Sequence, residues 1–211
     1  MTEMPRLMDM GLERLSNAIA DMGTLAQESV LKAIQAYVNG EQITQQAFDR
    51  ANQLSMVATE VEELAVDLLA RYQPVATDLR LIKSCLEIAY GFSRFGRYAY
   101  DIAQVLEIYG DLSQCDKSDV QELGEKVTQM IKTSILSFKT KDTKIARSLR
   151  QEDDQVDKIY RDYLKRVSQD KTMQVKCALA STLVLRYLER IGDHACYIGD
   201  SVTYIVTGSK V

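Results

Sequence analysis

The sequence contains few of the residues that interrupt helices. Its 211 residues include only two prolines, Pro5 and Pro74, together with ten glycines and no tryptophan. Hydrophobic residues make up 46% of the chain, yet no stretch approaches the roughly 20 uninterrupted apolar residues that a membrane span needs. A surplus of basic residues is also missing: the net charge is −4, which argues against a nucleic-acid-binding protein. Scarce helix breakers and abundant helix-forming residues predict long helices in a soluble, all-α fold.

Cysteine is also used sparingly. The four cysteines form no CxxC pair and have no spacing typical of a disulfide framework, which favours small buried side chains in a reducing compartment: Cys85, Cys115, Cys177 and Cys196. The N-terminal stretch lacks the charged-then-apolar order of a signal peptide. We therefore expect a cytoplasmic protein that reaches a membrane only through a partner.

Hydrophobic periodicity predicts six helices and no strand. Their expected ranges are 7–38, 42–71, 74–109, 120–139, 143–168 and 171–207. In the first of these helices one stripe of residues is expected to be core: Leu15, Ile19, Met22, Val30, Ile34 and Tyr37. The methionines of the same segment, including Met8 and Met10, are also most simply read as core.

The two halves of the chain read as copies of each other. SRFGRYAYDI at 93–102 aligns with ERIGDHACYI at 189–198, and VLKAIQAY at 30–37 aligns with IKTSILSF at 131–138. A repeat of this length is a duplicated three-helix unit rather than a solenoid of short units. The sequence thus predicts two pseudo-symmetric three-helix bundles, with domains at 1–110 and 111–211.

Four carboxylates lie in pairs on the last two expected helices. Asp153 and Asp157 are four residues apart, as are Glu189 and Asp193, so each pair shares one helix face. If the two helices pack side by side, the pairs converge, and an uncompensated cluster of this kind is costly. A multivalent cation bound by hard oxygen ligands removes that cost. These four residues are the candidate metal ligands.

A solvated helix face is the simpler alternative. Asp157 is placed to pair with Arg161, and Asp154 with Lys158, at i,i+4; Arg186 and Arg190 are placed to pair with Glu189 and Asp193 at i,i+3. Such exposed pairs contribute only about 0.5 kcal/mol each.

His194 and two glycines occupy positions close to the acidic pairs. His194 lies about 100° around the helix from Asp193, which favours a structural or supporting role over direct metal ligation. Gly96 and Gly192 recur at equivalent places within helices, and close helix packing is the simpler account because Gly96 persists in the half without the carboxylates.

The chain resembles the PhoU family of phosphate-uptake regulators. The resemblance covers nearly the whole sequence and rests on QPVATDLR at 73–80, ERIGDHA at 189–195, IVTG at 205–208 and the duplicated layout. It implies a fold of two three-helix bundles and (Glu/Asp)-x-x-x-Asp motifs that hold multinuclear iron or zinc clusters. It also implies negative regulation beside a phosphate ABC transporter and its sensor kinase.

Carried over to this chain, the family ligands fall on Asp153, Asp157, Glu189 and Asp193. The corresponding positions of the first half hold no acidic residue: Ala51, Ser55, Ser93 and Arg97. We therefore expect one metal centre, in the C-terminal half only.

The leading functional hypothesis is a non-enzymatic negative regulator of phosphate uptake and phosphate-starvation signalling. It would bind iron or zinc and dock onto a phosphate ABC transporter ATPase, a phosphate sensor kinase, or both, with a homodimer as one further assembly to test. A helical interaction module without metal is the alternative. A ferritin-like di-metal oxidase fits poorly, because such sites use Glu-x-x-His motifs and Ile191 stands three residues before the single histidine. Nucleophile-elbow and phosphate-loop motifs are absent.

Overall fold

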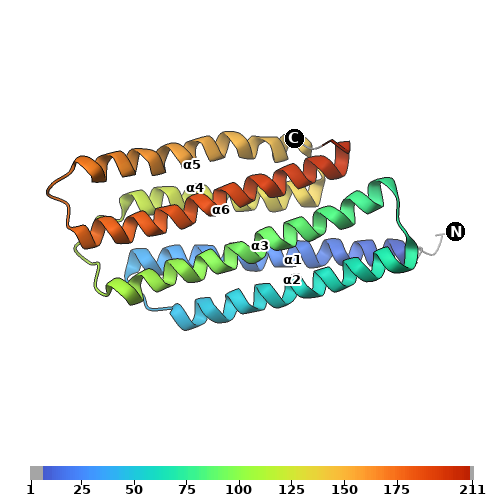
Figure 1. The fold of residues 1–211 in the computed structure, drawn as a ribbon, viewed down its shortest axis with the longest axis horizontal. Helices are drawn as coiled ribbons and strands as arrows, with labels where there is room; N and C mark the ends of the chain where they lie inside the picture. The colour runs from blue at the N-terminus through green and yellow to red at the C-terminus, as the bar shows by residue number, and fades with distance from the viewer. Residues whose placement is uncertain (1–6, 210–211) are drawn as a thin grey trace.

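The computed structural model describes residues 7–209 and folds them into six α-helices without a strand (Figure 1). The helices are α1 (Leu7–Asn39), α2 (Thr44–Tyr72), α3 (Ala76–Tyr109), α4 (Ser118–Thr140), α5 (Thr143–Gln169) and α6 (Val175–Thr207). Their number and order match the sequence prediction, and most ends fall within two residues of it.

Local turn chemistry sets the helix ends. Gly40 and Gly208 follow α1 and α6 with φ values of +76° and +75°, a left-handed conformation that glycine adopts without steric cost. Asp142 caps α5 by accepting hydrogen bonds from the backbone N–H groups of Lys144 and Ile145. Asp170 accepts from Thr172 and Met173 in the same way, and this Asx-type turn holds the chain out of a helix. The sixth helix consequently begins at Val175 and not at residue 171.

The two halves form the two expected three-helix bundles, α1–α3 and α4–α6. They pack against each other chiefly through α3 and α6, and also through α1 and α4. Figure 1 shows α3 and α6 side by side in the middle of the molecule, with α2 and α5 along its two edges. Each bundle thus contributes its third helix to the centre and keeps its second helix outside. The division into domains at residue 110 stays a prediction.

The predicted stripe of α1 forms part of one continuous core. All six of its residues are buried, and Leu15, Ile19, Val30 and Tyr37 have no exposed surface. The methionine prediction is only partly right: Met22 is buried, whereas Met10 is 52% exposed near the start of α1. Its side chain projects from the face of α1 opposite the core.

The structure also corrects the reading of the cysteines. Cys85 and Cys196 are buried free thiols, as expected. Cys115 and Cys177, however, form a disulfide between the α3–α4 linker and the first turn of α6, with their Cα atoms 5.3 Å apart. A separation of 62 residues gives no local signal for this pairing, which arises only when the linker folds onto α6. Within the described part of the chain, no helix is long and apolar enough to cross a membrane.

Candidate functional site

The two predicted acidic pairs lie on neighbouring helices. Asp153 and Asp157 project from α5, and Glu189 and Asp193 project from α6, which packs directly against it. Their charges influence one another: both Asp157 and Asp193 raise the pKa of Asp153, and all three aspartates raise the pKa of Glu189. The four carboxylates therefore lie near enough for their charges to interact, although no three of these described side chains form a group that could hold a metal ion.

Asp153 points into a space left by a glycine. A Cβ atom on Gly192 would lie 3.0 Å from Asp153 Oδ1. This buried oxygen has no hydrogen-bond partner among the described residues, although the Cys196 thiol interacts with the Asp153 carboxyl group and partly lowers its pKa. Burial, followed by the charges of Asp193 and Asp157, raises the pKa of Asp153 to about 6. Gly192 thus makes room for a carboxylate as well as for helix packing.

The equivalent glycine of the first bundle serves packing alone. A Cβ atom on Gly96 would lie 2.5 Å from Leu54 Cδ1 and 3.3 Å from the Cα atom of Ala51. Ala51 occupies the position that corresponds to Asp153 in the second bundle. The two glycines share the same place in the repeat, but they face an alanine in one half and an aspartate in the other.

Glu189 is the most buried of the four acids, with 8% of its surface exposed. Its Oε1 accepts a hydrogen bond from Arg186 at 2.6 Å. Its Oε2 is buried without a hydrogen-bond partner in the described chain, and Arg190 Nε lies 3.6 Å away. Burial and the charge of Asp193 outweigh the effect of Arg186 and raise the pKa of Glu189 to about 7.

The other two acids pair with arginines at the predicted spacings. Arg190 donates to Asp193 Oδ2 at 3.1 Å, and Arg161 lies 3.4 Å from Asp157 Oδ2. Burial, assisted by the charge of Asp157, raises the pKa of Asp193. The expected salt bridges of these residues are therefore present.

The donor set suits a hard cation, although the side chains do not enclose one in this conformation. Across residues 7–209, no three histidine, cysteine, aspartate or glutamate side chains form a group that could hold a metal ion. Yet Asp153 Oδ1 and Glu189 Oε2 are buried carboxylate oxygens without hydrogen bonds, and burying such atoms unpaired is costly. Oxygen donors of this kind are the ligands that hard cations prefer. The donor types suit a hard cation, and metal binding at these residues, which would require the arginine contacts to give way, stays a prediction.

The corresponding place in the first bundle is built differently. Ser93 Oγ donates a hydrogen bond to the carbonyl oxygen of Tyr90 at 2.8 Å, within its own helix. Arg97 lies 3.1 Å from Asp101 in an i,i+4 ion pair. Ser93 and Arg97 each have a partner within α3, and the two positions present no acidic pair to α2.

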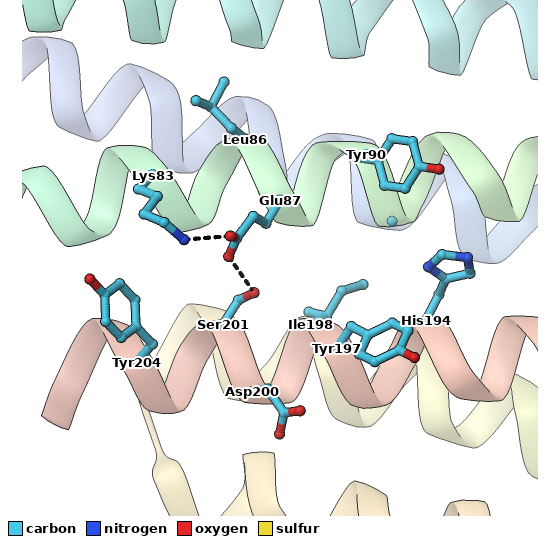
Figure 2. A pocket seen from close by; sticks show the side chains of 11 residues that line it. Lys83, Leu86, Glu87, Tyr90, His194, Tyr197, Ile198, Asp200, Ser201 and Tyr204 are labelled. Carbon is cyan, nitrogen blue, oxygen red and sulfur yellow. Dashed lines mark hydrogen bonds and ion pairs between the residues drawn. The ribbon is translucent and has the colours of Figure 1, made fainter. Parts of the chain in front are cut away.

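His194 faces away from the carboxylates, into a groove between α3 and α6. Its ring lies near three tyrosine rings, those of Tyr90, Tyr98 and Tyr197, at centroid distances of 5.8–6.1 Å. Figure 2 shows His194 and Tyr197 on α6 beside Tyr90 on α3. Burial lowers the pKa of His194, which favours the neutral imidazole. A structural or supporting role fits this environment.

The groove has a volume of about 590 Å³ and is mainly aromatic and aliphatic. Tyr90 and Tyr197 are 61% and 62% exposed on its two sides. The charges at its other end are already matched, since Lys83 pairs with Glu87 and Glu87 accepts from Ser201 Oγ (Figure 2). Sequence reasoning missed this groove because its walls come from segments about 100 residues apart.

Comparisons with known proteins place the chain in a family. The PhoU domain model matches residues 19–106 and again 120–202. The chain is 28% identical over 213 residues to a phosphate-specific transport system accessory protein PhoU homolog of Clostridium acetobutylicum, covering 98% of this chain and 97% of the relative. It is 29% identical over 211 residues to a homolog of the same description from Pseudomonas aeruginosa, and the match covers 95% of this chain and 85% of the relative.

Solved structures agree with these matches. The crystal structure of PhoU from Pseudomonas aeruginosa superposes with a TM-score of 0.87 at 30% identity, over 95% of this chain and 99% of that one. The phosphate transport system regulatory protein PhoU from Streptococcus pneumoniae has the same fold, with a TM-score of 0.90 at 21% identity. The superposition covers 97% of this chain and 99% of that one. The fold of two similar three-helix bundles defines a duplicated helical-bundle protein. The chain belongs to the PhoU family, as the sequence motifs indicated.

Proposed function

We propose that this protein is a non-enzymatic negative regulator of phosphate uptake and phosphate-starvation signalling. The support is its family membership along nearly the full chain, together with relatives that are named accessory proteins of the phosphate-specific transport system. Its proposed partners are the ATPase of a phosphate ABC transporter and a phosphate sensor kinase. It acts in the cytoplasm and reaches the membrane through those partners.

The observation that carries the metal part of the proposal is the pair of unpartnered oxygens on Asp153 and Glu189. Asp157 and Asp193 complete the set of ligands for iron or zinc. These four residues would hold the cation once Arg161, Arg186 and Arg190 had released their carboxylates. The cation would supply positive charge that offsets the mutual repulsion of the carboxylates, and its ligands would come from both α5 and α6.

The groove between α3 and α6 is the docking face in this proposal. Its charges are matched within the protein, so it suits an apolar segment of the ATPase or the kinase better than a charged one. Exposed tyrosines around a small concave surface are typical of the residues that dominate binding energy. Asp193 and His194 are consecutive on α6, so any rotation of α6 on metal binding also moves one wall of the groove.

A helical interaction module without metal is the second candidate. It is favoured by the arginine pairs, because three of the four carboxylates already have a cationic partner. In that case the acidic pairs only stabilise the α5–α6 hairpin, and docking through the groove is independent of metal.

Affinity capture under high phosphate tests these proposals. The tagged protein is purified from its own cells with and without chelator, and scored for the transporter ATPase and the kinase. Capture that falls on chelation and in an Asp157→Ala, Asp193→Ala double variant supports the metal-dependent regulator. Capture that survives both supports the metal-free module, and capture of neither partner contradicts the function.

A further inference from the structure

The Cys115–Cys177 disulfide joins two elements that meet only in the folded chain. Cys115 lies in the linker between α3 and α4, where it is partly exposed, and Cys177 lies in α6, where it is 9% exposed. We propose that this disulfide is a reactive redox site that exchanges with a dithiol reductant, with Cys115 as the sulfur that is attacked. The inference is independent of the metal ligands and of the docking groove.

The position of Cys177 makes it a good leaving group. It is the third residue of α6, which begins at Val175. The first turn contains no acidic residue, and the N-cap residue Gln174 makes no side-chain capping hydrogen bond. The first N–H groups of this 33-residue helix have no capping side chain, so they and the positive end of the helix can stabilise a thiolate, against the opposing effect of Gln174 Oε1 at 3.9 Å from Cys177 Sγ. Lys176, the preceding residue, carries a positive charge at the same helix end, with its Nζ on the carbonyl oxygen of Asp111.

The surroundings of Cys115 disfavour a thiolate, in contrast to those of Cys177. The next residue is Asp116, whose carboxylate accepts a hydrogen bond from the backbone N–H of Ser118 at 2.9 Å. That hydrogen bond lowers the pKa of Asp116 and keeps it negatively charged. A negative neighbour disfavours a thiolate at Cys115, while its partial exposure lets a reagent reach its sulfur. Exchange therefore has a direction, because the lower-pKa thiol leaves faster.

The reaction balances with a dithiol as the two-electron donor. A thiolate of the reductant attacks Cys115 Sγ, the bond to Cys177 Sγ breaks, and Cys177 leaves as a thiolate that later takes up a proton. The second thiol of the reductant then attacks the mixed disulfide and frees Cys115, which is protonated in turn. The protein gains two electrons and two protons, and the reductant becomes its own disulfide.

Cleavage changes how the inter-repeat linker is held. Lys176 Nζ donates a hydrogen bond to the carbonyl oxygen of Asp111 at 2.7 Å, and Leu112 is buried with 2% exposure. These contacts remain when the disulfide opens, so the bundles stay assembled. The linker and the first turns of α6 lose their covalent tie, and amide exchange is expected to rise at 110–118 and 175–180.

Thiol trapping tests the proposal on the full-length protein. Protein purified without reductant is treated with dithiothreitol, labelled with a maleimide under native conditions and mapped by mass spectrometry. The expected result is label on Cys115 and Cys177, and loss of that labelling when the reduced protein is treated with oxidised dithiothreitol before the maleimide is added. Glutathione at a limiting dose should leave its adduct on Cys115. Four free thiols before treatment, reduction only at denaturant concentrations that unfold the protein, or an adduct on Cys177 would each overturn it.

Variants of the neighbouring lysine test the leaving-group argument. Lys176→Met should slow reduction about threefold for each pKa unit by which the Cys177 thiol rises, and Lys176→Arg should restore the rate. Lys171→Met, in the exposed α5–α6 loop, removes the same charge farther from the sulfur and should leave the rate near that of the wild type. Equal rates for Lys176→Met and Lys176→Arg contradict the proposed activation. The site of the glutathione adduct on the wild type still decides the direction of attack if a variant folds poorly.

Discussion

The stability of the metal-free protein should fall as pH rises, and Glu189→Gln should remove much of that loss. Burial and neighbouring acids raise the pKa of Glu189 from 4.5 to about 7 and that of Asp153 from 3.8 to about 6. The folded protein therefore holds protons that the unfolded chain has released at the same pH. Stability is full below the unfolded pKa values and decreases as pH rises through about 4 to 7.

The size of the stability loss follows from the raised pKa of Glu189. A rise in pKa as large as that of Glu189 changes the free energy of unfolding by about 3 kcal/mol when solvent is fully excluded. The raised pKa already includes the opposing effect of Arg186. Screening by solvent between α5 and α6 reduces the free energy, and we expect about 1–2 kcal/mol for Glu189. His194 acts in the opposite direction, because its lowered pKa makes the folded state more stable above pH 6.5 than below it. Comparing variant with wild type cancels that contribution.

Urea unfolding of chelator-treated protein at pH 5 and pH 8 measures this pH-dependent change in the free energy of unfolding. The wild type should lose stability at pH 8, and Glu189→Gln should be about 1 kcal/mol more stable than the wild type there but equal to it at pH 5. Glu122→Gln, an exposed position on α4, is the matched control and should follow the wild type. A wild type that is more stable at pH 8, or a Glu189→Gln variant that is less stable there, would refute the reasoning.

Two further predictions concern α6 and the groove. Gly199→Ala places a Cβ atom 2.7 Å from a backbone oxygen of α5 and should cost about 1–3 kcal/mol of stability in urea unfolding while metal binding persists. Gly192→Ala, two turns earlier on the same face, makes its tightest contact with Asp153 Oδ1 at 3.0 Å and only ordinary contacts with Val156 and Met130, so it should weaken metal binding in a calorimetric titration with a smaller change in stability. Replacing the exposed Tyr90 and Tyr197 by alanine should lower partner capture about tenfold but alter the unfolding free energy by less than about 0.5 kcal/mol.

The fold was readable from the sequence because its signals are local and repeated. Long amphipathic runs with few breakers define the helices, and the alignment of SRFGRYAYDI with ERIGDHACYI defines the duplication. The error at the start of α6 is equally local. Asp170 hydrogen-bonds its own backbone neighbours, and hydrophobic periodicity does not register that competition.

The placement of the acidic pairs on α5 and α6 was predictable from the sequence, whereas metal binding by these residues stays a prediction. A spacing of four places Asp153 with Asp157, and Glu189 with Asp193, whatever the tertiary structure. The sequence also suggested the arginine pairs, but it could not show which oxygens remain unpaired. That depends on the side-chain packing between α5 and α6, where a missing Cβ at Gly192 admits Asp153.

The disulfide and the groove depend on contacts between distant segments. Cys115 meets Cys177 because the linker folds back onto α6, and the groove forms because α3 and α6 lie side by side. Neither arrangement has a periodic signature. Both become visible only when the two repeats are assembled.

Metal content per chain is the most direct test of the central claim that Asp153, Asp157, Glu189 and Asp193 form one metal centre. Protein purified without chelator is analysed by inductively coupled plasma mass spectrometry beside an Asp157→Ala, Asp193→Ala variant. An Asp154→Ala, Glu122→Ala variant controls for the loss of two exposed charges. The account predicts iron or zinc in the wild type and the control, and loss of that metal from the first variant. Metal that survives removal of Asp157 and Asp193 would contradict it.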